Sequence, residues 1–150
     1  PEFSSAVFDI TIPVEDEGIN HFRDCSNDES LSAHLRRNAL YMSTGYEDLD
    51  DSFTLTCGII KLSEDLVIVH MGGEPCCEVK FNSMDVFKDF HVIFSGYTDG
   101  CAYTVTDKML AEDGYEVRCF LEYMHKGRIK PGIDKLIHDG FEVALSQIRS

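Results

Sequence analysis

Two short apolar runs, each ending at a glycine-rich turn, constrain the fold of this chain more than any other feature. Residues 66–71 are mostly apolar and stop at Gly72-Gly73-Glu74, and residues 92–95 stop at Gly96-Tyr97. Residues 76–88, between them, have weak helical periodicity. The order strand, helix, strand predicts a crossover connection and hence parallel pairing. Polar side chains at the carboxyl ends of such strands are typical of a ligand site.

Other segments extend this sheet. Residues 53–62 read as a strand that reaches residues 66–71 through a short turn, which predicts a hairpin. Because residues 66–71 are apolar at successive positions, we expect that strand to be covered on both faces. Residues 6–13 alternate in polarity and end at Pro13, which favours an edge or lead-in strand.

Two amphipathic helices are expected to flank the sheet. Ser26 and Glu29 have the spacing of a capping box, and apolar residues follow at helical spacing until Gly45. Pro131 begins the second helix, which should dock on the sheet. Residues 115–130 alternate as an extended piece, and residues 47–51 form an acidic loop, read as a solvated connection rather than a cation site. The apolar stripe expected for the second helix is Ile133, Leu136, Ile137, Phe141, Ala144, Leu145 and Ile148. The sequence therefore predicts an α/β fold, a mixed sheet with flanking helices, in a single domain.

Composition restricts the possible partners. The 150 residues include 27 acidic and 13 basic ones, a formal net charge of −14, which repels phosphate backbones and anionic lipids. Nucleic acid is therefore not an expected partner. No apolar run is long enough for a membrane span, and no signal peptide is visible, so we expect a soluble protein. The six cysteines lack paired spacing, which favours reduced thiols over a disulfide framework.

The first three residues, Pro1-Glu2-Phe3, are typical of a cloning site joined to a tag. We therefore expect residues 4–150 to be a piece of a longer protein, with the natural amino terminus upstream. Its compartment cannot then be read from this sequence.

The order of these motifs resembles the carboxyl-terminal portion of the catalytic domain of neutral/alkaline ceramidases. In that family one strand ends in Gly-Glu, as residues 71–74 do, and a later strand ends in Gly-Tyr, as residues 96–97 do. A helical turn then leads to Gly-Tyr-Glu, matched at residues 110–116, and a Pro-Gly introduces the last helix, as at residues 131–132. The resemblance spans most of the chain.

The resemblance implies a zinc-dependent amidohydrolase that cleaves an N-acyl amide such as ceramide. Zinc would polarise the amide carbonyl and activate a water to attack it. Family members hold zinc with two histidines from the earlier part of the domain, the glutamate of Gly-Glu and a tyrosine. None of the six histidines here lies in the family's histidine motif. The resemblance thus implies Glu74 and Tyr103 as metal ligands, Tyr103 and Asp99 (where the family has Asn) as catalytic, and Gly73, Gly96, Tyr97 and Tyr115 as substrate-binding.

The same residues have other interpretations. Glu74 is equally suited to stabilising the N-terminus of the following helix, and Tyr103 to anchoring a turn as a core phenol. His70, four residues before Glu74, is read as a packed or surface histidine rather than a ligand. A thiol mechanism would use Cys101 near Asp99, with His70 or His91 as the base.

Two functions follow as expectations. The first is half of a ceramidase-like zinc site, inactive without the upstream part of the same chain, which would supply the missing ligands. The second is a non-catalytic binding or regulatory module whose acidic surface engages a basic partner. An exposed strand edge would also permit a homodimer.

Overall fold

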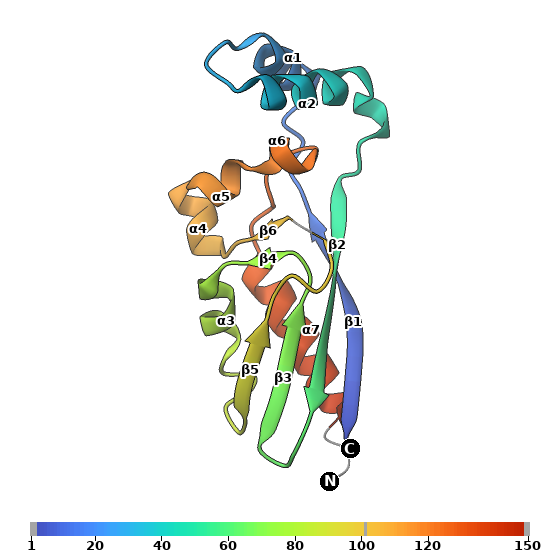
Figure 1. The fold of residues 1–150 in the computed structure, drawn as a ribbon, viewed down its shortest axis with the longest axis vertical. Coiled ribbons are helices and arrows are strands. Elements are labelled where there is room, and N and C mark those ends of the chain that lie inside the picture. Colours follow the sequence, from blue (N-terminus) through green and yellow to red (C-terminus); the bar gives the residue numbers. More distant parts are fainter. Residues whose placement is uncertain (1–2, 101, 149–150) are drawn as a thin grey trace.

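A computed structural model describes residues 3–100 and 102–148. Its centre is a four-stranded mixed sheet in the order β1-β2-β3-β5 (Figure 1). The first three strands pair antiparallel, whereas β3 and β5 pair parallel. The strands are β1 (Ser4–Pro13), β2 (Ser52–Lys61), β3 (Leu66–Met71) and β5 (His91–Ser95).

The hairpin and the crossover lie where the sequence predicts them. Strands β2 and β3 form the hairpin, and Leu62 N–H donates to the Leu66 carbonyl across its turn at 2.9 Å. The chain then passes through β4 (Glu74–Pro75) and α3 (Cys77–Ser83) before returning as β5. Strand β1 is an edge strand, as expected.

Helix α7 (Ile133–Ile148) packs on one face of the sheet, as predicted (Figure 1). Phe141 is fully buried at the centre of this contact, with its ring 5.6 Å from Phe8 and 5.4 Å from Phe87 between centroids. Leu136 does not belong to the buried stripe, because it is 39% exposed. The buried side chains of the helix are Ile133, Ile137, Phe141, Ala144, Leu145 and Ile148.

The described residues leave the opposite face of the sheet open, so the prediction that β3 is covered on both faces is wrong. Burial alternates along β3, with Val67 and Val69 fully buried and Ile68 between them only half-buried. On the same outer face Val7 is 66% exposed and Ile93 52% exposed. The apolar run of β3 therefore reflects the β-propensity of valine and isoleucine rather than burial on two sides.

Two helices occupy the region between β1 and β2, where the sequence predicted one. These are α1 (Ile19–Asn27) and α2 (Ala33–Thr44), followed by the 3₁₀ turn η1 (Tyr46–Asp48). The capping box is wrong: Ser26 lies inside α1, and Ser32 caps α2 by accepting from the Leu35 N–H at 3.2 Å. Gly45 ends α2, as expected.

Residues 115–123 are helical, which corrects the extended prediction for this segment. They form α5 (Tyr115–Arg118) and α6 (Phe120–Tyr123), after β6 (Tyr103–Thr104) and α4 (Asp107–Glu112). Val117, Phe120 and Leu121 are buried at spacings of three and four, which is a helical pattern. Further along, Ile129 forms an isolated antiparallel bridge with Val14, and Lys130 N–H donates to the Pro13 carbonyl at 2.9 Å.

None of the helices in the described ranges combines the length and the apolar character that crossing a bilayer requires.

Candidate functional site

The site predicted from the sequence is held together by backbone hydrogen bonds between two turns. Gly73 N–H donates to the Asp99 carbonyl, and Tyr97 N–H donates to the Gly73 carbonyl at 2.8 Å. Glu74 N–H then donates to the Ala102 carbonyl, also at 2.8 Å. The turn after β3 and the turn after β5 therefore form one unit.

Two glycines make this close approach possible. Gly73 has φ +68°, and a Cβ there would lie 2.5 Å from the Ala102 carbonyl oxygen. A Cβ on Gly96 would lie 2.7 Å from Cδ of Pro75. The structure thus gives both residues a role in backbone packing. Their contact with substrate stays a prediction.

Glu74 and Tyr103, the two implied metal ligands, are direct partners. They are paired in the short parallel ladder of β4 and β6, and paired residues of neighbouring strands project to the same face. Tyr97, whose backbone is left-handed at φ +59°, forms a side-chain hydrogen bond with Glu74. Its phenol is the donor, because an ionised carboxylate only accepts.

Desolvation and acidic neighbours together raise the pKa values of the groups around Glu74. The hydrogen bond to Glu74 raises the pKa of Tyr97 to about 12. Desolvation and then the charge of Glu74 raise the pKa of Tyr103. Desolvation also raises the pKa of the Cys76 thiol to about 11, with the charge of Glu116 adding to it. At neutral pH the site therefore presents protonated phenols and thiols around a carboxylate.

Tyr103 is also the centre of an aromatic cluster. Its ring meets Tyr115 and Tyr123 edge to face, with centroids 6.1 and 6.0 Å away. Tyr115 was predicted as a substrate contact and is 62% exposed. Tyr123 was not predicted, because its helix was read as extended.

His125 is a second residue that the sequence did not single out. It stacks on Phe53 at 4.3 Å and lies 6.0 Å from the Tyr123 ring. Burial lowers its pKa, which keeps the imidazole neutral near pH 7. With Tyr103 and Tyr123 it lines a cavity of about 20 Å³, roughly the space of one water molecule.

The remaining predicted residues lie outside this cluster. The Asp99 side chain is exposed, and its backbone carbonyl serves the turn. His70 Nδ1 lies 3.4 Å from Thr98 Oγ1, and its ring covers Gly58 on the open face of the sheet. His91 begins β5, at the opposite end of the strand from the turn. Cys101 lies outside the described residues, so the thiol mechanism stays untested.

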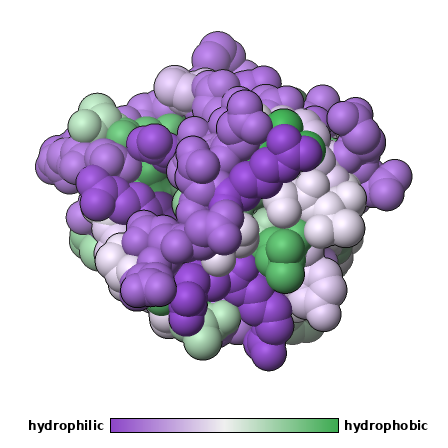
Figure 2. Space-filling view, turned by 90° about the horizontal axis from the view of Figure 1, so that it is seen from above, coloured by the Kyte–Doolittle hydropathy of each residue, from purple (hydrophilic) through white to green (hydrophobic). Residues whose placement is uncertain are grey.

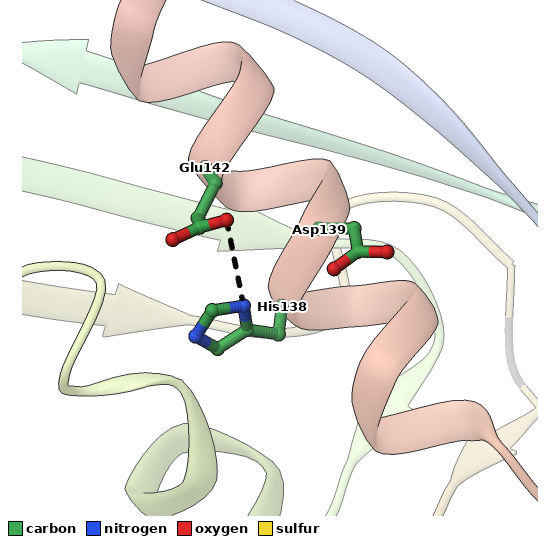
Figure 3. Close-up of side chains that lie close together, drawn as sticks. All are labelled: His138, Asp139 and Glu142. Carbon is green, nitrogen blue, oxygen red and sulfur yellow. Dashed lines mark ion pairs between the residues drawn. The ribbon is translucent and has the colours of Figure 1, made fainter.

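A different part of the molecule holds the group that comes nearest to a metal site in residues 3–100 and 102–148. His138, Asp139 and Glu142 of α7 place one ligand atom each within 4.8 Å of one another (Figure 3). These side chains already have partners on the surface. His138 Nε2 lies 3.1 Å from Asp85 Oδ2, and Asp139 pairs with Lys135. An exposed group satisfied in this way is an ordinary ion-pair network.

Zinc fits the predicted site only in part. Catalytic zinc usually has three protein ligands and a water, whereas Glu74 and Tyr103, paired across the β4–β6 ladder, would supply two oxygen ligands. A complete centre of the ceramidase type would need nitrogen ligands supplied by residues other than those that the structure describes.

Comparison of the chain with protein-family models, with curated proteins and with solved structures finds no match. The ceramidase resemblance therefore depends on the motifs alone.

Proposed function

We propose that the chain contributes a carboxylate–phenol pair to a zinc-dependent hydrolase of N-acyl amides, similar to neutral ceramidases. The observation that supports this proposal is the parallel pairing of Glu74 with Tyr103. The family resemblance requires these two side chains to share one metal, and they lie 29 residues apart in sequence. The upstream part of the protein would supply the two histidines.

In this proposal each residue of the chain has a defined task. Glu74 binds the metal through a carboxylate oxygen, and the Tyr97 hydrogen bond fixes the orientation of that carboxylate. Tyr103 binds as a phenolate. Because desolvation and then the charge of Glu74 raise its pKa, loss of the proton would depend on the positive charge of the metal. Bound zinc would supply Lewis-acid activation of the amide carbonyl and of water.

The test uses the protein with its natural upstream chain. We expect one zinc per protein and release of fatty acid from an N-acylsphingosine. Glu74→Gln and Tyr103→Phe should lose stoichiometric zinc, while Tyr97→Phe should bind it about 10- to 100-fold more weakly. Glu64→Gln, an exposed residue of the turn between β2 and β3, is the control and should leave zinc content and activity unchanged.

Activity and zinc content that survive both ligand changes would refute the proposal. An upstream region without two closely spaced histidines would refute it as well.

A non-catalytic binding module is the second candidate, and the charge of the site favours it. The charged groups that raise the pKa of Tyr103 and Cys76 include Glu74 and Glu116, and the chain has a net charge of −14. Such a surface attracts a basic partner. If the protein with its natural upstream chain does not hydrolyse an N-acylsphingosine, and Glu74→Ala abolishes capture of a basic peptide in low salt, this candidate is correct.

A further inference from the structure

A cavity with a partly apolar lining lies between two pairs of helices, and its lining residue Tyr115 contacts Tyr103 of the β4–β6 ladder. Helices α1 and α2 form one wall, and α5 and α6 form the other (Figure 1). Its volume of about 440 Å³ is within the range of small-molecule sites. Figure 2 views this end of the molecule, where hydrophilic residues predominate and hydrophobic ones show between them.

The inner lining is apolar. Leu31, Leu35 and Phe120 line the cavity and also belong to the cluster that packs α1 and α2 against α6. Phe120 is 8% exposed, and the ring of His21 lies over it at 5.8 Å. Helix packing therefore leaves a half-buried apolar surface that a hydrocarbon or aromatic group can cover.

The helices are fixed in place by a polar anchor, so this cavity is not a gap between loose elements. Asn38 of α2 is buried, and its amide donates to the Leu121 carbonyl of α6 at 3.1 Å. Met42 and Ala39 are fully buried in the same contact. A site on helices anchored in this way keeps its shape before a ligand binds.

The rim of the cavity carries negative charge that its arginines do not neutralise. Both arginines at the rim are already paired: Arg118 contacts Asp113 at 2.6 Å, and Arg128 contacts Asp113 and Glu17, each at 3.1 Å. Asp28 and Glu122, which also line the cavity, are in none of the salt bridges of the described residues.

The pKa values of the two thiols in the lining, Cys25 and Cys119, are raised in part by the negative charges around the cavity. The charges of Asp28 and two further carboxylates add to burial in raising the pKa of Cys25. On the opposite wall, burial and the charge of Glu122 raise the pKa of Cys119. Both walls of the cavity therefore favour a positive charge.

We propose that this cavity binds a cationic amphiphile, a protonated amine attached to an alkyl or aromatic body. The body would cover Leu31, Leu35 and Phe120, and the ammonium group would lie between Asp28 and Glu122 at the rim. Tyr115 and Phe120, both in the lining, offer aromatic surface that also attracts a cation. The inference does not depend on zinc, although the cavity shares Tyr115 with the substrate site that the ceramidase resemblance implies.

The experiment compares three probes with one alkyl body and different heads: octylamine, octan-1-ol and octanoate. Binding to the 150-residue chain is measured at pH 7 by NMR shifts of the backbone amides. We expect octylamine to bind most tightly and octanoate most weakly, with the largest shifts in α1, α2, α5 and α6. Equal or tighter binding of octanoate, or shifts centred elsewhere, would overturn the proposal, as would the absence of saturable binding.

Two variants test the body and the head separately. Leu35→Trp places a large ring in the cavity and should abolish octylamine binding. Glu122→Lys should weaken octylamine about three- to tenfold, as expected for one partly exposed charge, and should improve octanoate. Glu142→Lys makes the same charge change on exposed α7 and should leave the order of the probes unchanged. Equal effects of the two lysine variants would refute a local charge effect.

A third measurement keeps the proposal testable if Leu35→Trp does not fold. Cys25 lines the cavity, whereas Cys77 is exposed on α3. Octylamine should slow alkylation of Cys25 by iodoacetamide, mapped by mass spectrometry, and should leave Cys77 unchanged. Equal rates at Cys25 with and without octylamine would contradict the proposal.

Discussion

Replacement of Gly73 by alanine should destabilise the protein far more than a single methyl group suggests. The left-handed backbone at φ +68° costs about 1–2 kcal/mol for a residue with a Cβ. The new Cβ would also lie 2.5 Å from the Ala102 carbonyl oxygen, about 1 Å inside ordinary contact. Relief of that overlap must lengthen hydrogen bonds that join the two turns, each worth about 1 kcal/mol. The sum is about 3–5 kcal/mol.

Gly100→Ala is the matched control for this change. Gly100 has nearly the same backbone, φ +71°, but among the described residues that are not its chain neighbours the nearest atom to a Cβ there is 3.9 Å away. We expect it to cost only the conformational part, about 1–2 kcal/mol. Urea unfolding followed by circular dichroism should separate the two midpoints by about 1–2 M, at a slope of about 2 kcal/mol/M. Equal midpoints would refute the argument that Ala102 excludes a side chain at residue 73.

Three further predictions concern other parts of the fold. Phe141→Ala should cost about 3–5 kcal/mol in urea unfolding because Phe141 is fully buried, whereas Leu136→Ala, at an exposed position of the same helix, should cost about 1 kcal/mol or less. Asp107→Ala should cost about 1–2 kcal/mol, measured in the same way, since its carboxylate accepts backbone N–H groups at the start of α7. Arg118 holds the pKa of Asp113 below its ordinary value, so this ion pair stabilises the fold above about pH 4, and the stability is lost as the pH falls through the lowered pKa. In Asp113→Asn the free energy of unfolding should therefore fall less steeply below about pH 4 than in the unchanged protein. An unchanged stability–pH profile would contradict this.

The central sheet could be predicted from the sequence because its signals are local. Residues 66–71 and 92–95 are apolar runs bounded by glycine, and a helical pattern between them leaves a parallel crossover as the simple solution. The sequence did not predict the strand pairing of Glu74 with Tyr103, because the family resemblance implied only that both residues bind one zinc.

The helical end of the molecule could not be predicted equally well. Residues 115–123 alternate in polarity over a short span, and two single-turn helices produce the same pattern when their buried side chains come from neighbouring turns. Ser26 and Glu29 matched a capping box, but Ser32 had the same chemistry and the better position. Because of these two errors the sequence analysis missed helices that line the cavity of about 440 Å³. The cavity could therefore not be predicted from the sequence.

The structure separates what the turn at residues 72–74 does for the fold from what it would do in catalysis. The turn after β3 and the turn after β5 can approach because Gly73 has no Cβ, and the hydrogen bonds of Gly73 between them use backbone atoms alone. Glu74 projects from the same turn, but the described backbone contacts at residue 74 use its N–H and leave the carboxylate free to serve Tyr97 or a metal. A loss of activity in Gly73→Ala would therefore say nothing about zinc. Only side-chain changes that keep the ladder, Glu74→Gln and Tyr103→Phe, distinguish a metal ligand from a structural residue.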